Sequence, residues 1–411
     1  MQFRKNISTL KVHHNKHTAG CEPIRVAPPK EVLLPMNMHS GSPAEPIVAV
    51  GDYVRVGQLI AKPGEGMSCP VHATVSGTVS AIEPYKQADG RSALTIKIES
   101  DGKMERDPNL KPPVFDDVDG FLAAVKDSGV VGLGGAAYPL WGKLDAIRKN
   151  QIDTVLVNAA ECEPYITSDT RMMVDNTELV AKGVELLHKW MNAKKVVICI
   201  EDNKQEAIMS LRSLVKKYPG IELRILPTRY PQGSEKQLIQ SVTGRQVPSG
   251  KLPVNAGCAV FNVATFAAIF RATYWGVPLT QRIVTISGEA VNMPQNFQVR
   301  IGTSFHDLIK EAGGLTDATE RVVSGGPMMG FAQSDLSVPV IKATNSILCL
   351  PHDVNGAAEN PVCLRCGKCV SVCPMRLQPL YMYRFTNAGK VEELNRLNIL
   401  DCMECSKRRK G

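Results

Sequence analysis

Cysteine thiols give this sequence its clearest sign of chemistry. Six of the twelve cysteines gather near the end of the chain, at Cys363, Cys366, Cys369, Cys373, Cys402 and Cys405. In the bacterial ferredoxin spacing C-x2-C-x2-C-x3-C-P, the first three thiolates bind one iron-sulfur cluster and the fourth binds its neighbour. Zinc also binds Cys-x2-Cys pairs, but three cysteines at two-residue intervals followed by Cys-Pro are not a zinc-finger spacing. The motif therefore predicts two adjacent 4Fe-4S clusters as metal sites.

The second half of this motif departs from the ferredoxin pattern. After Cys405 the sequence reads Ser406 to Gly411 without a further cysteine. Two clusters need about eight thiolates, and this region supplies the six named above. We therefore expect an incomplete ferredoxin-like domain over residues 355–411, which holds one cluster or none stably.

The composition is that of a multidomain globular protein from a reducing compartment. With 411 residues, 44% of them hydrophobic and 21% charged, the chain is long enough for several domains. Of the net charge of +8, four positive charges lie at residues 407–410, and no basic stripe interleaved with aromatics indicates nucleic acid. The other six cysteines are scattered, unlike a disulfide framework. We expect no signal peptide and no direct membrane span, because no apolar stretch reaches about 20 residues.

Short strands and turns fill the region from residue 46 to residue 98. We expect strands over residues 46–50, 54–61, 71–79 and 94–98. The segment from Val50 to Ala61 resembles biotinyl/lipoyl domains, which are small β-sandwiches with a modified lysine at a hairpin tip. The equivalent turn here, Ser68-Cys69-Pro70, has no lysine. A structural module over residues 30–111 is therefore expected, and not a swinging arm.

Strands alternate with amphipathic helices after Pro112-Pro113. Residues 154–157, 195–200 and 221–226 read as strands. An intervening helix carries one apolar face made of Val180, Val184, Leu187 and Met191. This alternation predicts a parallel sheet covered on both faces.

A glycine-rich segment precedes the first of these strands. Gly132, Gly134 and Gly135 stand shortly before a predicted helix that contains Lys143. Glycines let backbone N–H groups approach a phosphate, the helix N-terminus adds its dipole, and a lysine adds a point charge. The alternative is a simple turn, which a glycine-rich segment often is.

Polar residues follow the strand at 154–157 directly. Asn158, Glu161 and Glu163 come beyond its carboxyl end, where ligands of open α/β sheets bind. Two later segments are expected to complete the pocket, and they contribute Gly233, Glu235, Asn262 and Thr265. Asn262 and Thr265 have an equally good alternative as helix caps.

A small α+β unit is expected to begin near Arg282. Ile283 to Gly288 and Phe297 to Ile301 read as strands, and a helix capped by Thr303 or Ser304 follows. This unit resembles the soluble-ligand-binding β-grasp (SLBB) domain.

Together these segments carry a family resemblance. Four of them look like the FMN- and NADH-binding subunit of respiratory NADH dehydrogenase: Gly132 to Lys143, Asn158 to Pro164, Gly233 to Leu238 and Asn262 to Thr265. The whole order is similar to the C-subunit of the Rnf (Rsx) ion-translocating ferredoxin:NAD oxidoreductase family. The resemblance implies an N-terminal segment at 1–29, a lipoyl-like β-sandwich at 30–111, a flavodehydrogenase-like FMN/NADH domain at 114–280, an SLBB-like β-grasp domain at 281–345 and the 4Fe-4S ferredoxin-like domain at 355–411.

The resemblance also implies a function. NADH would reduce FMN, and the electrons would pass singly to the clusters and to other subunits of a membrane electron-transport complex. It assigns Glu163 and Glu235 to NADH, and it assigns Gly134, Gly135, Lys143, Asn158 and Asn262 to FMN. A peripheral position on the cytoplasmic face of the bacterial inner membrane is expected. Two alternatives stay open, a cobalamin reductase of a bacterial microcompartment and a non-catalytic iron-sulfur scaffold without flavin.

Overall fold

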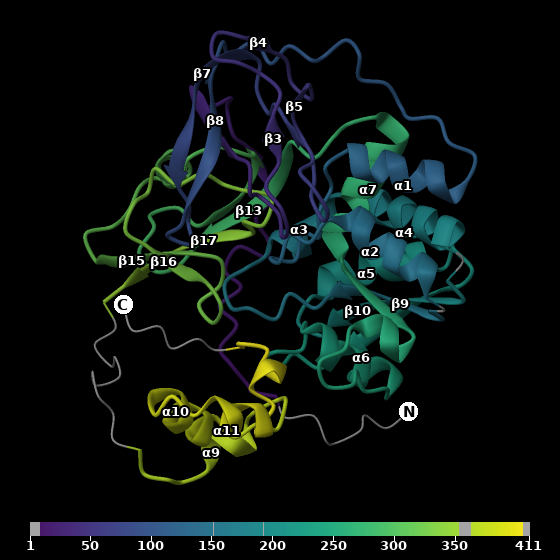
Figure 1. The fold of residues 1–411 in the computed structure, drawn as a ribbon, viewed down its shortest axis with the longest axis vertical. Coiled ribbons are helices and arrows are strands. Elements are labelled where there is room, and N and C mark those ends of the chain that lie inside the picture. Colours follow the sequence, from purple (N-terminus) through teal and green to yellow (C-terminus); the bar gives the residue numbers. More distant parts are fainter. Residues whose placement is uncertain (1–8, 151, 192, 353–362, 406–411) are drawn as a thin grey trace.

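The computed structural model describes residues 9–150, 152–191, 193–352 and 363–405. Within them Figure 1 shows four parts: a β module (purple and blue), an α/β core (teal), a second β-rich unit (green) and a helical C-terminal part (yellow). Ser406 to Gly411, and the start of the expected ferredoxin-like domain at 355–362, lie outside the described residues.

The β module contains two antiparallel sheets. One has the strand order β2-β8-β7-β4, and the other has the order β3-β5-β6. Their bounds are Glu31–Pro35 (β2), Glu45–Pro46 (β3), Tyr53–Val54 (β4), Leu59–Lys62 (β5), Val71–His72 (β6), Gly77–Lys86 (β7) and Ser92–Ser100 (β8). Three predicted strands were wrong in extent, since 46–50 is strand only at its start, and 54–61 and 71–79 are each split in two. Gly51 and Gly57, with φ of 95° and 88°, turn the chain at the first two of these places.

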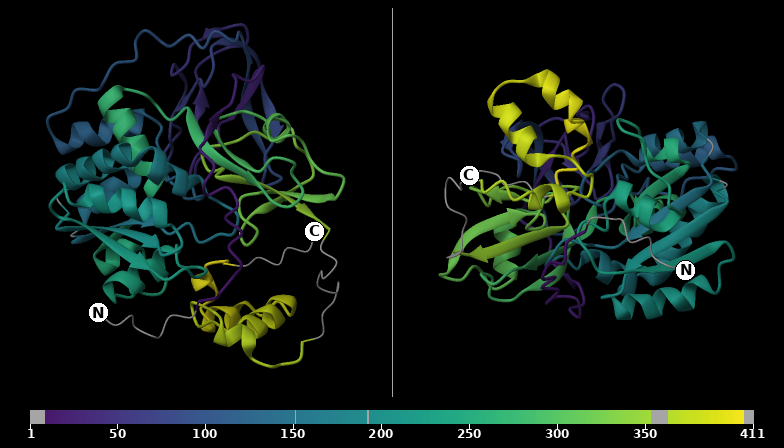
Figure 2. Two further views of the ribbon diagram at one scale, coloured as in Figure 1. Left: turned by 180° about the vertical axis from the view of Figure 1, so that it is seen from behind. Right: turned by 90° about the horizontal axis from the view of Figure 1, so that it is seen from below.

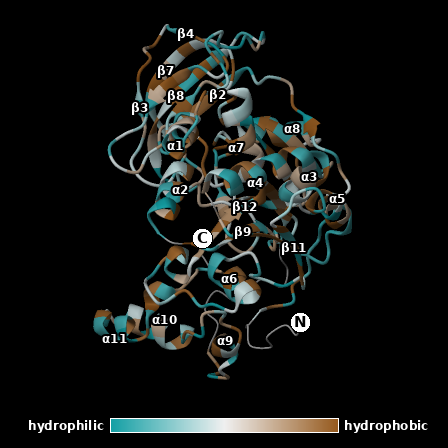
Figure 3. Ribbon diagram, turned by 90° about the vertical axis from the view of Figure 1, so that its right-hand side faces the viewer, coloured by the Kyte–Doolittle hydropathy of each residue, from teal (hydrophilic) through white to brown (hydrophobic). Residues whose placement is uncertain are grey.

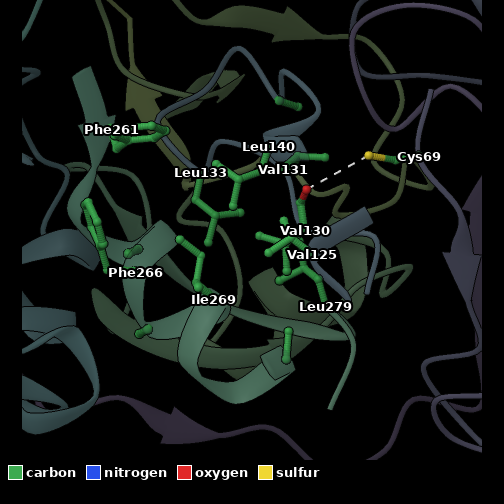
Figure 4. Close-up of a cluster of buried hydrophobic side chains, with 14 of the residues drawn as sticks. Cys69, Val125, Val130, Val131, Leu133, Leu140, Phe261, Phe266, Ile269 and Leu279 are labelled. Carbon is green, nitrogen blue, oxygen red and sulfur yellow. Dashed lines mark hydrogen bonds between the residues drawn. The ribbon is translucent and has the colours of Figure 1, made fainter. Parts of the chain in front are cut away.

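The tip of the module's hairpin packs against the core instead of pointing into solvent. Ser68 and Cys69 have no exposed surface. The Trp141 indole N–H donates to the Ser68 carbonyl at 2.8 Å, and the Cys69 thiol lies 3.9 Å from the Val130 carbonyl oxygen (Figure 4). A tip held in this way fits a structural module and not a swinging arm.

The α/β core is built on a four-stranded parallel sheet in the order β11-β10-β9-β12. The strands are Thr154–Ala159 (β9), Lys195–Glu201 (β10), Ile221–Leu226 (β11) and Cys258–Asn262 (β12). The helices are Val118–Asp127 (α1), Leu140–Lys149 (α2), Ser168–Asp175 (α3), Thr177–Met191 (α4), Gln205–Val215 (α5), Glu235–Thr243 (α6) and Val263–Trp275 (α7), with a 3-10 turn at Pro253–Ala256.

Both faces of this sheet are covered, as the sequence predicts. Val155 and Val157 of β9 belong to one buried cluster, and Leu156 between them belongs to another. The predicted apolar face of α4 is buried, including Val184 and Leu187. Figure 3 shows the covering helices with hydrophobic and hydrophilic residues interleaved, as expected for helices with one buried side.

The second β-rich unit is a six-stranded mixed sheet in the order β1-β14-β13-β17-β15-β16. Its strands are Ile24–Arg25 (β1), Gln281–Ser287 (β13), Gln295–Arg300 (β14), Thr319–Ser324 (β15), Phe331–Gln333 (β16) and Ser346–Pro351 (β17). One helix, Phe305–Glu311 (α8), packs on it, and Ser304 caps that helix by accepting a hydrogen bond from the Asp307 N–H. Of the two caps that the sequence allows, Ser304 is therefore the one used.

The C-terminal part consists of short helices that dock on the core. They are Lys368–Ser371 (α9), Pro379–Asn387 (α10), Val391–Arg396 (α11) and a 3-10 turn at Ile399–Asp401. Figure 2 shows this yellow part in two further views. The Lys236 ammonium lies 3.2 Å from the Asp401 carboxylate, and the Gln237 amide donates to the Pro374 carbonyl at 3.1 Å.

Candidate functional site

The carboxyl ends of two neighbouring strands define the candidate site. Asn158 of β9 and Asn262 of β12 are paired in register in the parallel sheet. The glycine loop lies against them, because a Cβ added to Gly134 would stand 3.2 Å from the Asn262 Cβ. The Leu133 N–H donates to the Thr265 hydroxyl at 3.0 Å. Three segments that are distant in sequence therefore meet at one sheet edge.

The glycine loop keeps open space on its other side. A Cβ at Gly135 would meet nothing within 4 Å, and Gly135 has a φ of 109° that favours glycine. A Cβ at Gly132 would meet only the Tyr138 carbonyl at 3.8 Å. The Ala137 methyl group packs in the main hydrophobic cluster and is 3% exposed. The backbone around Gly135 thus remains accessible to a ligand.

Ser40 of the β module braces the same loop. Its N–H donates to the Ala137 carbonyl at 3.0 Å, and its hydroxyl donates to the Ala136 carbonyl at 2.7 Å. The module that the sequence marks as structural therefore contributes directly to the shape of the candidate site.

Asn158 and Asn262 orient the surrounding backbone. The Asn158 amide donates to the Gly233 carbonyl at 2.7 Å, which joins the third predicted segment to β9. Asn262 is the N-cap of α7, since its side-chain oxygen accepts from the Ala264 N–H at 2.9 Å. The capping alternative is thus confirmed for Asn262. Its amide also donates to the Asp169 carboxylate at 2.6 Å.

Lys143 and Glu235 form an ion pair across the mouth of the site. The Lys143 ammonium lies 2.5 Å from the Glu235 carboxylate, and the two side chains are 28% and 45% exposed. The ammonium also stands 5.2 Å from the centre of the Phe261 ring. The residue expected to meet a phosphate and the residue expected to meet NADH are therefore neighbours.

The Glu161 carboxylate has a structural role at the start of α3. Its side chain is 4% exposed. Its carboxylate accepts from the Asp169 N–H at 2.7 Å and from the Thr170 hydroxyl at 2.6 Å. A carboxylate at the start of α3 is favoured by the helix dipole. Any contact of this residue with a cofactor would come from its backbone.

Glu163 reaches the second β-rich unit. Its carboxylate accepts from the backbone N–H groups of Met328 and Met329 at 3.1 and 3.0 Å. A Cβ at Gly326 would stand 2.3 Å from this carboxylate, so glycine allows the close approach. Burial raises the pKa of Glu163 to about 7, against the opposing effect of the two hydrogen bonds.

Asp169 was not predicted from the sequence. It is a single acidic residue in the first turn of α3, a position that usually indicates only helix-dipole stabilisation. Burial, and next the negative charge of Glu161, raise its pKa to about 7. A titratable carboxyl group is therefore hydrogen-bonded to the Asn262 amide.

Cys405 is the clustered cysteine that docks on the core, and it lies near Cys373 and Cys402. Burial, and then the nearby thiols of Cys373 and Cys402, raise the pKa of Cys405. The Tyr230 hydroxyl donates to the Cys405 carbonyl oxygen. Cys363, Cys366 and Cys369 are exposed. In the part of the chain that the structure describes, no three metal-ligating side chains converge on one point.

The described residues fit FMN better than they fit an iron-sulfur cluster. Open glycine backbone, paired asparagines and a lysine suit a phosphate-bearing nucleotide such as FMN. Thiols are the ligands that iron-sulfur clusters require, but among the described residues no three of them converge on one point.

Three family models match parts of this chain. A Nuo51 FMN-binding domain matches residues 125–271, an RnfC barrel sandwich hybrid domain matches residues 3–103, and an SLBB domain matches residues 283–332. A solved structure of an NAD⁺-reducing NiFe-hydrogenase in the air-oxidised state has a TM-score of 0.51 at 22% identity, over 58% of this chain and 47% of that chain. This likeness concerns the fold alone.

Curated relatives match over most of the chain. The C-subunit of the Na⁺-translocating ferredoxin:NAD⁺ oxidoreductase complex of Acetobacterium woodii is 42% identical over 91% of this chain and 85% of its own length. The proton-translocating counterpart of Clostridium ljungdahlii is 43% identical over 89% of this chain and 80% of its own length. The C-subunit of the ion-translocating oxidoreductase complex of Pseudomonas aeruginosa is 42% identical over 94% of this chain and 51% of its own length. The chain therefore belongs to the RnfC family, the C-subunits of the ion-translocating ferredoxin:NAD⁺ oxidoreductase (Rnf) complexes.

Proposed function

We propose that this chain is the NADH-linked, FMN-binding electron-transfer subunit of a membrane-associated ion-translocating ferredoxin:NAD oxidoreductase complex. The observation that carries the proposal is the meeting of the glycine loop, Asn158, Asn262 and the Gly233 backbone at the carboxyl edge of one parallel sheet. Ligands of open parallel sheets bind at this edge.

The FMN site is assigned to the open side of the glycine loop. Gly134 and Gly135 would expose backbone N–H groups to the phosphate, and Lys143 would add a positive charge. The Gly132 N–H instead donates to the Tyr138 carbonyl at 2.9 Å and so shapes the loop. Asn158 and Asn262 hold the strand ends under the loop through the hydrogen bonds described above. Thr265 fixes the loop itself through the Leu133 N–H.

The NADH site is assigned to Glu163 and Glu235, next to the flavin. FMN, when bound, supplies the chemistry that takes two electrons as a hydride and releases them one at a time. The chain's own residues bind and orient the two nucleotides. The Glu235 carboxylate pairs with Lys143, and Glu163 is oriented by the loop at Gly325–Gly330 through Met328 and Met329.

Iron-sulfur clusters are assigned to the C-terminal cysteines. Cys373, Cys402 and Cys405 would supply three of the about four thiolates of the cluster nearer the core, and Cys363, Cys366 and Cys369 would supply three for the outer one. With these six thiolates, one cluster at most is expected to be stable. The docking of this part on α6 and Tyr230 supports an electron path from the flavin edge outward.

Other subunits of the complex are the proposed partners, at the cytoplasmic face of the bacterial membrane, and membrane attachment is assigned to them. Among the described residues, no helix is long and apolar enough to cross a bilayer. The names of the relatives support this function over a cobalamin reductase or a flavin-free scaffold.

The proposal is tested by anaerobic reconstitution with FMN followed by addition of NADH. We expect one flavin per chain, and we expect NADH to bleach its visible absorbance. Protein that folds but retains no FMN in gel filtration, even after incubation with an excess, would contradict the proposal. Free flavin mixed with NADH, without protein, is the control.

A further inference from the structure

Residues 9–25 pass beside the candidate site, and we call them the N-terminal strap. Leu10 exchanges two backbone hydrogen bonds with Tyr230, of 2.7 and 2.9 Å, and Ile24–Arg25 pairs with β14 of the second β-rich unit. Figure 2 shows this purple segment running between the core and that unit. The strap therefore joins the edge of the core to its neighbour.

Lys16 is the strap's main contact with the site. Its ammonium donates to the backbone carbonyls of Glu161, Glu163 and Ile166 at 2.8, 2.8 and 2.5 Å. The Tyr165 N–H donates in turn to the His14 carbonyl at 2.9 Å. All three donors of one ammonium group are thus spent on a single loop that follows β9.

This loop needs external support. Glu161 and Tyr165 have φ of 49° and 68°, a left-handed conformation that is unfavourable for residues other than glycine. The carbonyls of Glu161, Glu163 and Ile166 converge on one ammonium group. Charge-assisted hydrogen bonds are about twice as strong as neutral ones, so a lysine can hold such a turn.

The buried charge of Lys16 indicates a role beyond packing. Its side chain is 14% exposed, and its nearest acidic oxygen, from Glu161, lies 3.9 Å away. Burial lowers its pKa to about 8. Because an ammonium group that leaves water is costly unless it is fully hydrogen-bonded, an apolar residue would serve simple packing better.

We propose that Lys16 is a positioning residue for the nucleotide site. By fixing the carbonyls of Glu161, Glu163 and Ile166, it holds the loop in the conformation that orients the Glu163 carboxylate and the Cys162 thiol. That thiol accepts from the Gly233 N–H at 3.4 Å, which links Lys16 to the segment that Asn158 also holds. This inference rests on the proposed function, because it assigns Lys16 to the same FMN and NADH site.

The test uses the full chain with the variant Lys16→Met, which keeps the length of the side chain but has no donor. Arg245→Met is the matched control. Arg245 also holds backbone carbonyls, those of Ala256 and Gly257 at 3.1 and 3.5 Å, but it does so at the amino end of the sheet. Each protein is measured by amide hydrogen exchange without FMN, and by fluorescence titration with FMN.

We expect Lys16→Met to speed exchange in residues 160–166 and to raise the Kd for FMN by about tenfold, equivalent to about 1.4 kcal/mol. Arg245→Met should lower the thermal midpoint without changing either quantity in the site. If Lys16 only stabilised the fold, Lys16→Met and Arg245→Met would lower the thermal midpoint equally, and the Kd for FMN would not change. Lys16→Arg keeps charge and donors, and it should restore FMN affinity in part.

Two outcomes separate this inference from the proposed function. If wild-type protein binds no FMN, the proposed function fails, and the exchange rates of residues 160–166 still decide whether Lys16 holds the loop. If wild-type protein binds FMN and Lys16→Met matches it in exchange and in Kd, the role of Lys16 is overturned. If Lys16→Met does not fold, Lys16→Gln, which keeps an N–H donor, is judged by the same two measurements.

Discussion

Single residues at the candidate site combine a structural contact with a proposed chemical task. Glu161 and Asn262 are committed to the start of α3 and α7, and Glu163 is held by two N–H groups, whereas Lys143 and Glu235 remain partly exposed. This division was not visible in the sequence, where all of them followed strands or opened helices. It assigns nucleotide contacts to few side chains and many backbone groups, as is usual where phosphates bind.

Glu163→Gln tests the proposed contact with NADH. Replacing the carboxylate removes one charge-assisted hydrogen bond, so the efficiency of NADH-dependent reduction of an artificial acceptor should fall by about tenfold, or about 1.4 kcal/mol. Bound flavin, measured by absorbance, should stay unchanged. Steady-state kinetics equal to those of wild-type protein would remove Glu163 from the NADH site.

Glu163→Gln also tests how the free energy of unfolding depends on pH. Glu163 has a raised pKa of about 7 in the folded chain, against 4.5 in its ordinary state. Between these values the folded state binds more protons than the unfolded state, so this group's contribution to stability is lost as pH rises. From about pH 5 to about pH 8, wild-type protein should lose about 1 to 3 kcal/mol relative to Glu163→Gln in urea unfolding. Glu178→Gln, on an exposed face of α4, should show no such difference.

Lys143→Met tests the phosphate contact. Loss of the positive charge should raise the Kd for FMN by about tenfold at low salt and by less at high salt, because salt screens an exposed charge. Glu235→Gln is the control, since it breaks the ion pair with Lys143 but leaves the ammonium group. Equal loss of affinity in both variants would mean that the pair, and not the lysine charge, is required.

At the scale of elements, the loop Gly325–Gly330 closes on Glu163 only because Gly326 has no side chain. A methyl group there would stand 2.3 Å from a carboxylate that two N–H groups already hold. Gly326→Ala should therefore destabilise the chain by about 1 to 3 kcal/mol and weaken NADH binding, as measured by denaturant unfolding and by titration. Gly20→Ala, where a Cβ would meet nothing within 4 Å, should be neutral. Two variants of equal stability would contradict this packing.

The sequence predicted the regular elements of the core well and the contacts between its parts poorly. Strand β11 has the predicted bounds, and α4 buries the predicted face, because period and length are local properties of the sequence. No local pattern in the sequence indicates the contacts of Lys16. Its acceptors are backbone carbonyls about 150 positions away, and a carbonyl is present at every residue. Asp169 and Gly326 were missed for the same reason, since their roles depend on tertiary contact.

At the scale of the whole molecule, every described part of the chain contacts the proposed nucleotide site or the helix beside it. Ser40 of the β module braces the glycine loop, Lys16 of the strap holds the loop after β9, and Met328 of the second β-rich unit holds Glu163. The C-terminal part docks on the adjacent helix through Lys236 and Asp401. Such an arrangement suits a subunit that must collect a hydride at one place and deliver electrons at another.

Transfer of electrons from NADH to iron through this chain is the central claim, and an anaerobic NADH titration of protein reconstituted with FMN, iron and sulfide tests it most directly. Flavin absorbance and the electron paramagnetic resonance signal of reduced clusters are recorded in the same samples. We expect NADH to bleach the flavin and a reduced-cluster signal then to appear, which Cys405→Ala diminishes without affecting bleaching. Bound flavin that stays oxidised with NADH but is reduced by dithionite would show that NADH does not deliver electrons to this chain.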